Sequence, residues 1–432
     1  MTKISLSLGF LLIFFASSSS QTVVPNLPTT TMLPAAPPNQ TKRLVTILDA
    51  VSIFLQQNLD LVAARYDIDT AEAEKLSAGL RPNPSITVGS SGLPLKFNPL
   101  LNSQTFAYNV SQDLELGGKR AKRITVAEAN AELARATFQV VVWQMTNDVK
   151  KKFYAVLLAQ SLLSLSRENE KTFSEIVQHT REVFQAGEIS GLDLQRLEVE
   201  KFKFDTDLAN SERDYELALR DLRVSLGGDY RTMDVDVAGA IDYYKTYDFS
   251  FANMRDKAMS ARPDLKAAEL MERAANASIV LQDSQRVPNL TLTAGVNQVV
   301  AGGSNYNFGV GITLPVFDRN QAERAKAVIE KRKAQNQQLL ITNRITSDVD
   351  KAIVAYNIQK RRLELYRTGV LNKVTDIQNS TEYALKAGEN STLDLLDAIR
   401  TRRDTLAGFY QTIFDYQMSL LDLELATATP LP

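Results

Sequence analysis

The 432-residue sequence contains no cysteine and only one histidine, His179. The absence of cysteine excludes disulfides, thiol catalysis, zinc–thiolate sites and acylation on cysteine. The single histidine lies in a long polar helical stretch, which indicates a surface residue. With no other histidine in the chain, a Ser/His/Asp catalytic triad is not expected. The formal net charge is −1, so the basic balance of a nucleic-acid-binding protein is missing as well. We therefore expect no enzyme, no metal site, no cofactor and no nucleic-acid partner.

Long hydrophobic runs are also scarce. Beyond residues 6–16, no apolar stretch approaches the roughly 18 residues that mark a membrane-spanning helix. Lys3 precedes that stretch and the small residues Ser17–Ser20 follow it, which is the layout of a secretory signal peptide over residues 1–20. No cysteine follows, so the mature chain is not expected to be a lipoprotein. If the protein crosses a membrane, it must use strands.

Proline is absent over two long parts of the chain. After a Pro/Thr-rich linker at residues 21–43, no proline occurs in residues 101–262 or 316–429. Proline breaks helix interiors, so its absence permits very long helices. We predict helices over Lys119–Ala186 and Asn320–Ala387, 68 residues each. At ~1.5 Å per residue each would be about 100 Å long, which indicates a tubular, coiled-coil-like architecture.

An internal duplication with an offset near 200 residues organises the chain. The four matched pairs of segments, which keep the same order in both halves, are residues 60–64 and 264–268, 82–89 and 288–295, 110–114 and 310–314, and 186–193 and 387–394. Each half is predicted to contain a helix, two strands, a very long helix, a tight turn and a return helix. The predicted repeats are residues 44–227 and 250–426, joined by an equatorial linker at 228–249 and followed by a tail at 427–432.

Alternation with a period of two identifies the strands. In residues 290–297 and 305–314 apolar side chains alternate with small or polar ones, and residues 301–304 between them form a hairpin connection. The first half repeats the pattern more weakly around Ile86 and Tyr108. One apolar and one small, polar face is typical of an outer-membrane barrel, although a sheet with one solvated face has the same pattern.

A barrel cannot be closed by four strands. About eight strands are the practical minimum, and lipid does not tolerate an open sheet edge. A barrel therefore requires several copies of the chain, and three copies with four strands each would supply twelve strands.

The return helices carry apolar residues at spacings of three and four along residues 194–222 and 399–423, so they should pack along their whole length. Gly187 and Gly388 are predicted to end the long helices. Asp193 and Asp394 should lie in the first turn of the return helices, where negative charge suits the helix dipole.

Three sequence segments add a family resemblance to this layout. They are Leu114–Arg120 with Gly117 and Gly118, Leu314–Gln321 with Pro315, and Ala261–Leu265. The chain resembles the TolC family of outer-membrane efflux ducts over nearly all of its mature length. The first of these segments resembles the strand-to-helix junction of the heavy-metal cation efflux branch.

The resemblance implies a mainly α fold with a small β part. It implies a homotrimer in outer-membrane lipid, with a 12-stranded β-barrel continuous with a 12-helix periplasmic barrel. It further implies a periplasmic adaptor and an inner-membrane pump, of the resistance–nodulation–division type, docking at the hairpin tips. The predicted docking residues are Gly187, Glu188, Leu192, Gly388, Glu389 and Leu393.

Asp394 and Asp397 are the candidate gate residues. They lie three positions apart and so share one helix face. The resemblance implies that they line the periplasmic entrance, where six carboxylates of a trimer would attract cations. The alternative is a solvated face on which Asp397 pairs with Arg400. Asp193 is the third candidate gate residue, because it occupies the matching position of the first half, although its neighbour there is Arg196 rather than a second acid.

Several functions remain open at this point. A gated, passive efflux duct fits best, carrying metal cations or drugs. A duct for protein secretion would have the same layout. A periplasmic adaptor is disfavoured by two hairpins and four strands, and a helical-bundle enzyme by the lack of a buried polar constellation. Three methionines on one predicted helix, Met254, Met259 and Met271, are interpreted as core packing rather than a metal site.

Overall fold

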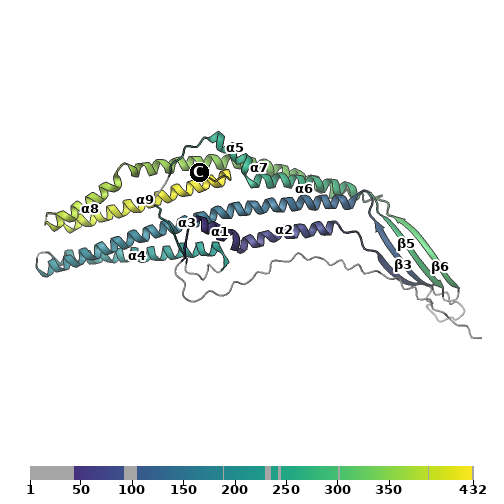
Figure 1. Ribbon diagram of the computed structural model, residues 1–432, viewed down its shortest axis with the longest axis horizontal. Helices are drawn as coiled ribbons and strands as arrows, with labels where there is room; N and C mark the ends of the chain where they lie inside the picture. Colours follow the sequence, from purple (N-terminus) through teal and green to yellow (C-terminus); the bar gives the residue numbers. More distant parts are fainter. Residues whose placement is uncertain are drawn as a thin grey trace, which may run out of the picture. The chain divides into compact units, whose positions relative to one another are not determined.

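The computed structural model describes residues 43–91, 105–187, 189–228, 235–241, 245–299, 302–387 and 389–430 (Figure 1). They belong to one compact unit, Lys42–Pro432. This unit is mainly helical with a small β part, as predicted. Within the described ranges no single helix is long and apolar enough to cross a membrane. Only α1 (Ile47–Gln57) and α2 (Leu59–Ala78) meet that test together, and they are bent by 45° at their junction.

The order of helices and strands in the first half is repeated in the second half. After α1 and α2, the first half continues with β2 (Ser85–Ser91), β3 (Thr105–Leu114), α3 (Lys119–Gln185) and α4 (Gly191–Leu226). The second half contains α5 (Phe251–Ala261), α6 (Pro263–Gln285), β5 (Leu290–Val299), β6 (Gly303–Ile312), α7 (Gln321–Arg367), α8 (Val370–Lys386) and α9 (Thr392–Thr427). In Figure 1 the strands lie beyond one end of α6 and α7, and the α3–α4 and α8–α9 hairpins extend at the other.

The opening helix of each half is divided at an equivalent residue, a break that the sequence analysis did not anticipate. Asn58 separates α1 from α2, and Arg262 separates α5 from α6; both have extended backbone angles. Asn58 caps α2, because its Oδ1 accepts a hydrogen bond from the Leu61 amide at 3.0 Å. Arg262 precedes Pro263, which disfavours helical angles in the preceding residue and suits the first helical position itself.

The two long helices differ, and here one expectation was wrong. Helix α3 runs without interruption for 67 residues, ending at Gln185 rather than Ala186. The predicted helix Asn320–Ala387 is instead two helices, α7 of 47 residues and α8 of 17. The break is at Gly369, whose φ of 86° is in the left-handed region that glycine adopts without steric cost. The equivalent position of the first half, at the same distance before its hairpin turn, is Glu168, and α3 continues through it.

Four strands form one antiparallel sheet in the order β2-β3-β5-β6. The register places Ile86 opposite Val110, Val110 opposite Ala294, and Ala294 opposite Phe308. Apolar side chains therefore fall in rows across one face of the sheet, as the period of two predicted. Several are strongly exposed in the single chain, including Phe308 at 84% and Val310 at 70%.

The opposite face of the sheet is polar and crowded at one point. Ser111 and Thr293 are hydrogen-bonded at 3.1 Å, and Thr291 donates to Asp113 at 2.6 Å. A Cβ atom on Gly295 would lie 2.0 Å from Asn109 Oδ1 and 2.6 Å from the Tyr108 carbonyl oxygen. Gly295 thus allows neighbouring carboxamides to cover the backbone at this position.

Two short parallel strands, which the sequence analysis did not anticipate, cross the middle of the bundle. β1 (Arg43–Val45) pairs with β4 (Val235–Val237), so the start of the first half meets the linker that follows it. They pack on the largest apolar core, whose buried aromatic residues include Phe54, Phe153, Tyr356 and Tyr416. Tyr356 Oη accepts a hydrogen bond from the Tyr247 amide at 2.7 Å, so this core also holds the connection between the two halves.

The methionines that the sequence placed on one helix are divided between two. Met254 and Met259 lie in α5 and Met271 in α6. Met254 is buried, and Met259 packs against the same apolar cluster, as expected for core residues. Met271 is 42% exposed and lies outside that cluster, so the core interpretation was wrong for it.

The entrance hairpins and the strand-to-helix junctions

The α3–α4 turn is built by a glycine and a cap. Helix α3 ends at Gln185, and Gly187 follows with a φ of 83°. Ser190 caps α4, since its Oγ accepts a hydrogen bond from the Asp193 amide at 3.2 Å. Asp193 lies in the first turn, where its carboxylate complements the helix dipole. Arg196 is 3.6 Å from this carboxylate, so the first hairpin presents an ion pair rather than two acids.

The α8–α9 turn repeats this design with a complete capping box. Ser391 Oγ accepts from the Asp394 amide at 3.3 Å, and Asp394 Oδ2 accepts from the Ser391 amide at 3.0 Å. These side-chain and backbone hydrogen bonds from Ser391 hold the pKa of Asp394 below its usual value. Asp394 therefore has a structural role at the start of α9, which its spacing from Ser391 could have predicted.

The predicted docking residues lie at these turns. Leu192 lies in the first turn of α4 and is 58% exposed, and Leu393 lies in the first turn of α9 and is 53% exposed. Glu389 is exposed as well. Glu188 and Gly388, the other two positions singled out, lie outside the described residues.

A groove of about 510 Å³ separates the two turns of the chain. Its lining residues on the first hairpin include Asp193 and Arg196, and on the second Asn390 and Leu393. His179 also lines it from α3 and is exposed, as predicted. Neither Asp394 nor Asp397 is among the lining residues, so the structure separates the three candidate gate residues: Asp193 faces the groove and the other two do not.

Behind the groove, apolar side chains join the two hairpins. The buried cluster contains Phe173, Val177, Leu197, Phe204, Leu395, Leu396 and Ile399. The rings of Phe173 and Phe204 stack with centroids 4.6 Å apart. The seam that the sequence predicted along the return helices is thus a contact between hairpins as well as within them.

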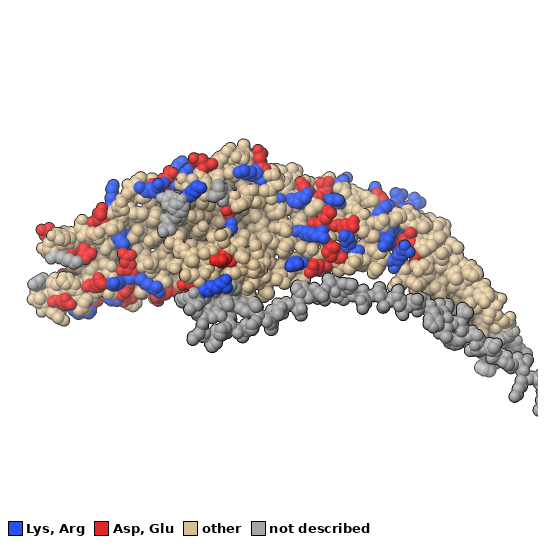
Figure 2. Space-filling model, in the orientation of Figure 1, with Lys and Arg blue, Asp and Glu red and all other residues tan. Residues whose placement is uncertain are grey.

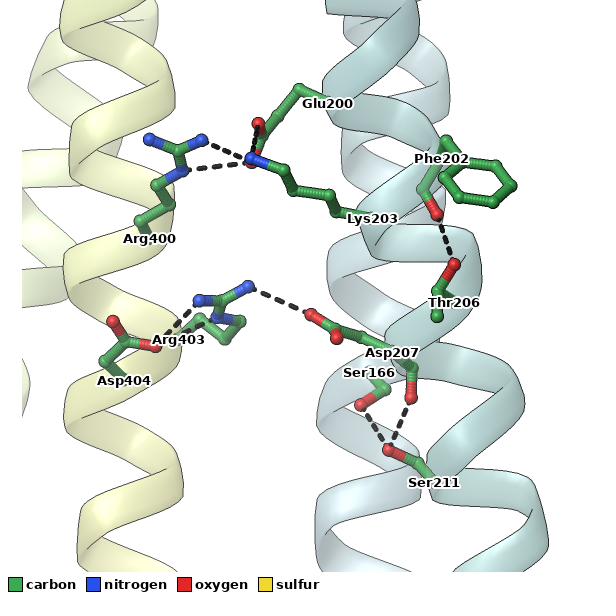
Figure 3. A network of polar contacts seen from close by, with 10 residues as sticks. All are labelled: Ser166, Glu200, Phe202, Lys203, Thr206, Asp207, Ser211, Arg400, Arg403 and Asp404. Carbon is green, nitrogen blue, oxygen red and sulfur yellow. Dashed lines mark hydrogen bonds and ion pairs between the residues drawn. The ribbon is translucent and has the colours of Figure 1, made fainter.

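Asp397 does not have the partner that the alternative interpretation gave it. Asp397 is exposed, and within the described part of the chain it makes no ion pair. Arg400 instead extends from α9 to Glu200 of α4, donating from Nε at 3.1 Å (Figure 3). Lys203 Nζ also contacts Glu200, at 2.9 Å. A partner 200 positions away in the sequence replaces the expected local one.

Glu200 is an acid held among cations inside the hairpin contact. It is only 6% exposed, and this burial by itself raises its pKa. The hydrogen bonds from Arg400 and Lys203 outweigh burial, so the pKa of Glu200 is lowered overall. The hydrogen bond to Glu200 in turn raises the pKa of Arg400, and the charge of Asp397 makes a smaller contribution. Glu200 is thus ionised in the folded chain, and its charge ties α4 to α9.

A second ion pair joins the same two helices, one turn further along α9 and two turns further along α4. Arg403 of α9 contacts Asp207 of α4 at 3.1 Å, and its guanidinium lies over the Phe204 ring (Figure 3). Arg402 extends to Glu168 of α3 at 2.8 Å. The sequence analysis did not identify Arg400, Arg402 and Arg403 as residues that join the hairpins. The available signal was their close spacing on a helix face that was predicted to pack against its neighbours.

The first strand-to-helix junction depends on two consecutive left-handed glycines. Gly117 and Gly118 have φ values of 71° and 68°. A Cβ on Gly117 would lie 2.9 Å from Val287 Cβ, so this position also requires the small residue. Lys119 is buried directly afterwards and donates to Asn289 Oδ1 at 2.6 Å. Burial lowers the pKa of Lys119.

The second junction reaches the same geometry with a different residue. Pro315 follows β6, and Asn320 precedes α7 with a φ of 59°. Its Nδ2 donates to the Gln282 carbonyl oxygen at 2.8 Å, which anchors α7 to α6. Asparagine tolerates left-handed angles better than other non-glycine residues, so it replaces Gly118 in this role. Within the described ranges, no group of three or more His, Asp or Glu residues is placed to hold a metal ion.

Comparison with known proteins accounts for the combination of a four-stranded sheet with two long helical hairpins. The family model for outer membrane efflux proteins matches residues 50–228 and 254–428, one match in each half. The chain belongs to the outer membrane efflux protein family. It is an outer-membrane channel component of an efflux system, as predicted, and the family comprises transport channels rather than enzymes. The adaptor interpretation is therefore wrong.

Individual relatives support the same assignment. The cobalt-zinc-cadmium resistance protein CzcC of Cupriavidus metallidurans is 27% identical, and the alignment covers 92% of each chain. Among solved structures, the Campylobacter jejuni CmeC outer membrane channel gives a TM-score of 0.75 at 16% identity, covering 88% of this chain and 85% of that one. The CusC structure gives 0.72 at 18% identity, covering 92% and 96%. The fold is thus that of TolC-like channels.

Proposed function

We propose that three copies of this efflux protein form a passive, gated duct that carries divalent metal cations out of the periplasm. The observation that carries the proposal is the four-stranded sheet, which has two open edges, β2 and β6, and an exposed apolar face. Unpaired strand edges are not tolerated in lipid, so these edges must pair with other copies. Three copies would close a barrel of twelve strands.

The helical part of each copy would continue the barrel as a tunnel. An adaptor protein and an inner-membrane pump of the resistance–nodulation–division type would dock at its hairpin ends. Exposed leucines at both turns, Leu192 and Leu393, together with the largely apolar groove between the hairpins, support docking of a partner there. Glu389 and Gly187 belong to the same surface.

The cargo is inferred from the relatives and from the acids at the entrance. The relatives include proteins named for resistance to cobalt, zinc and cadmium and to nickel and cobalt. Asp394 and Asp397 are both exposed one turn apart on α9, and three copies would bring six carboxylates around one axis. Such a ring attracts cations and repels anions. Asp193 is neutralised by Arg196 and has less influence on this field.

Single-channel recording in a planar bilayer tests this proposal. We expect the full chain to open discrete, cation-selective channels, and Asp394→Asn/Asp397→Asn to reduce the cation preference and enlarge the openings. The matched control is Glu175→Gln/Asp376→Asn, which removes from α3 and α8 two exposed acids that have no ion pair among the described residues. Equal selectivity in both double variants would reject the acidic gate, and the absence of any channel in a folded preparation would reject the duct.

A further inference from the structure

An exposed arginine stands at each of the four places where a helix and a strand of the sheet are joined. Arg81 lies between α2 and β2, Arg120 at the start of α3, Arg286 between α6 and β5, and Arg319 between β6 and α7. The four strands themselves contain no lysine or arginine, and Asp113 is their only charged residue. Basic side chains are therefore absent from the sheet and first occur at its junctions with the helices (Figure 2).

Three of these four arginines are not used to hold the fold. Arg81, Arg286 and Arg319 make no ion pair and no side-chain hydrogen bond within the described residues. Arg120 donates only from Nε, to the Gly79 carbonyl oxygen at 2.6 Å. Two of the acids nearby have other partners, because Glu115 binds Arg123 and Asp283 binds Arg324. The third, Asp318, accepts a hydrogen bond from the Asn320 amide at 2.8 Å.

Each arginine also has an exposed apolar neighbour. Leu80 is 67% exposed beside Arg81, and Leu116 and Val287 are exposed at the next two junctions. At the fourth, Phe317 is 92% exposed beside Arg319. An apolar surface with a guanidinium at its edge matches a membrane interface, where acyl chains meet headgroups and the long arginine stem can extend to the phosphates.

We propose that Arg81, Arg120, Arg286 and Arg319 form an arginine belt that binds the phosphate groups of anionic phospholipids in the periplasmic leaflet of the outer membrane. This rests on the proposed membrane-spanning role of the sheet, because the belt must then lie at the periplasmic surface. The arginines are distributed one to a junction, which suits separate lipid headgroups. The exposed apolar neighbours favour a phosphate attached to acyl chains over a free phosphate ion.

Lipid preference in reconstituted vesicles tests the belt. The full chain is placed in phosphatidylcholine vesicles with spin-labelled phosphatidylglycerol or spin-labelled phosphatidylcholine, and the protein-bound fraction of each label is measured. One headgroup contact to an arginine should favour phosphatidylglycerol by roughly three- to fivefold. We expect Arg81→Gln/Arg286→Gln/Arg319→Gln to reduce the number of phosphatidylglycerol sites per chain to the one at Arg120, and the corresponding triple lysine variant to retain most of them.

A matched control separates the belt from a general loss of charge. Arg65→Gln/Arg332→Gln/Arg361→Gln removes three exposed arginines of α2 and α7 that have no ion pair in the part of the chain that the structure describes. This variant should leave the preference unchanged. A belt variant that keeps all the phosphatidylglycerol sites, or a control that loses them equally, would overturn the proposal. So would loss of the preference in millimolar inorganic phosphate, which would indicate a free-phosphate site. Channel recording on the same preparations distinguishes this outcome from failure of the proposed duct.

Discussion

At the level of single residues, Glu200 determines how the two hairpins of one chain are held together. Its carboxylate is buried between α4 and α9, and two cations from different helices neutralise it. A buried charge is strongly disfavoured unless it is paired, so the contact specifies which face of α9 meets α4. The neighbouring Arg403–Asp207 pair is more exposed and contributes less to this specificity.

Substitution of Glu200 should weaken the hairpin contact and remove part of its pH dependence. We expect Glu200→Gln to lower the free energy of unfolding by about 1–3 kcal/mol, because Arg400 loses a charged acceptor. The pKa of Glu200 is lowered from 4.5, so its contribution is complete above that pH and is lost as pH falls through the lower folded value. Thermal unfolding in detergent between neutral and acidic pH measures both effects.

The control for this experiment is Glu330→Gln. Glu330 pairs with Lys333 at 3.6 Å on the exposed surface of α7, where both side chains are more than half exposed. Exposed pairs contribute about 0–1 kcal/mol, so little change is expected. An equal loss of stability in the two variants, or an unaltered acid response in Glu200→Gln, would remove the special role of Glu200.

At the level of elements, the break between α7 and α8 is set by the backbone conformation of one residue, Gly369. The flanking residues Thr368 and Val370 are β-branched and favour the helix only weakly, and Gly369 between them has a left-handed conformation. Nothing lies within 4 Å of a Cβ added to Gly369, so backbone angle alone excludes other residues. The bend directs α8 toward α9, against which it packs to form the second hairpin.

A side chain at Gly369 should therefore strain the bend. We expect Gly369→Ala to destabilise the chain by about 1–2 kcal/mol, the usual cost of a left-handed non-glycine residue. Gly191→Ala provides the comparison, because Gly191 has no left-handed φ and its Cβ would make ordinary contact with Phe184 at 3.5 Å. Gly191→Ala should be neutral or slightly stabilising. Thermal midpoints that do not separate the two variants would contradict this account of the bend.

At the level of the whole molecule, the two faces of the sheet should differ in their tolerance of charge. Phe308 lies on the apolar face and is 84% exposed, while Asn307 lies beside it on the polar face and donates to Asn297 at 3.2 Å. A lysine facing lipid near the membrane centre costs about 2–4 kcal/mol, whereas one facing a wet lumen alters selectivity.

We therefore expect Phe308→Lys to prevent stable insertion, and Asn307→Lys to insert normally while shifting the channel toward anions. Heat-modifiable migration of outer-membrane fractions on gels measures insertion, and reversal potentials in a salt gradient measure selectivity. If Phe308→Lys inserts as well as the wild type, the apolar face does not contact lipid.

The sequence by itself determined the four strands of the antiparallel sheet, the repeated order of the elements, the capped turns and the extent of α3. These follow from local regularities: a period of two in residues 290–314, a repeated turn at residues 186–193 and 387–394, and a long interval without proline. Local patterns suffice because backbone hydrogen bonds and caps join residues a few positions apart. The bend at Gly369 was within reach too, since the glycine itself was the signal.

Only the tertiary structure decided which distant side chains are partners. Arg400 could have paired with Asp397 three positions away, yet it binds Glu200 because the apolar contacts of Phe204 and Leu395 bring α4 and α9 together. The pairing of β1 with β4 and the burial of Lys119 against Asn289 were likewise decided by packing. A charged side chain has several possible partners in the sequence, and the one that it meets depends on which surfaces the whole chain buries.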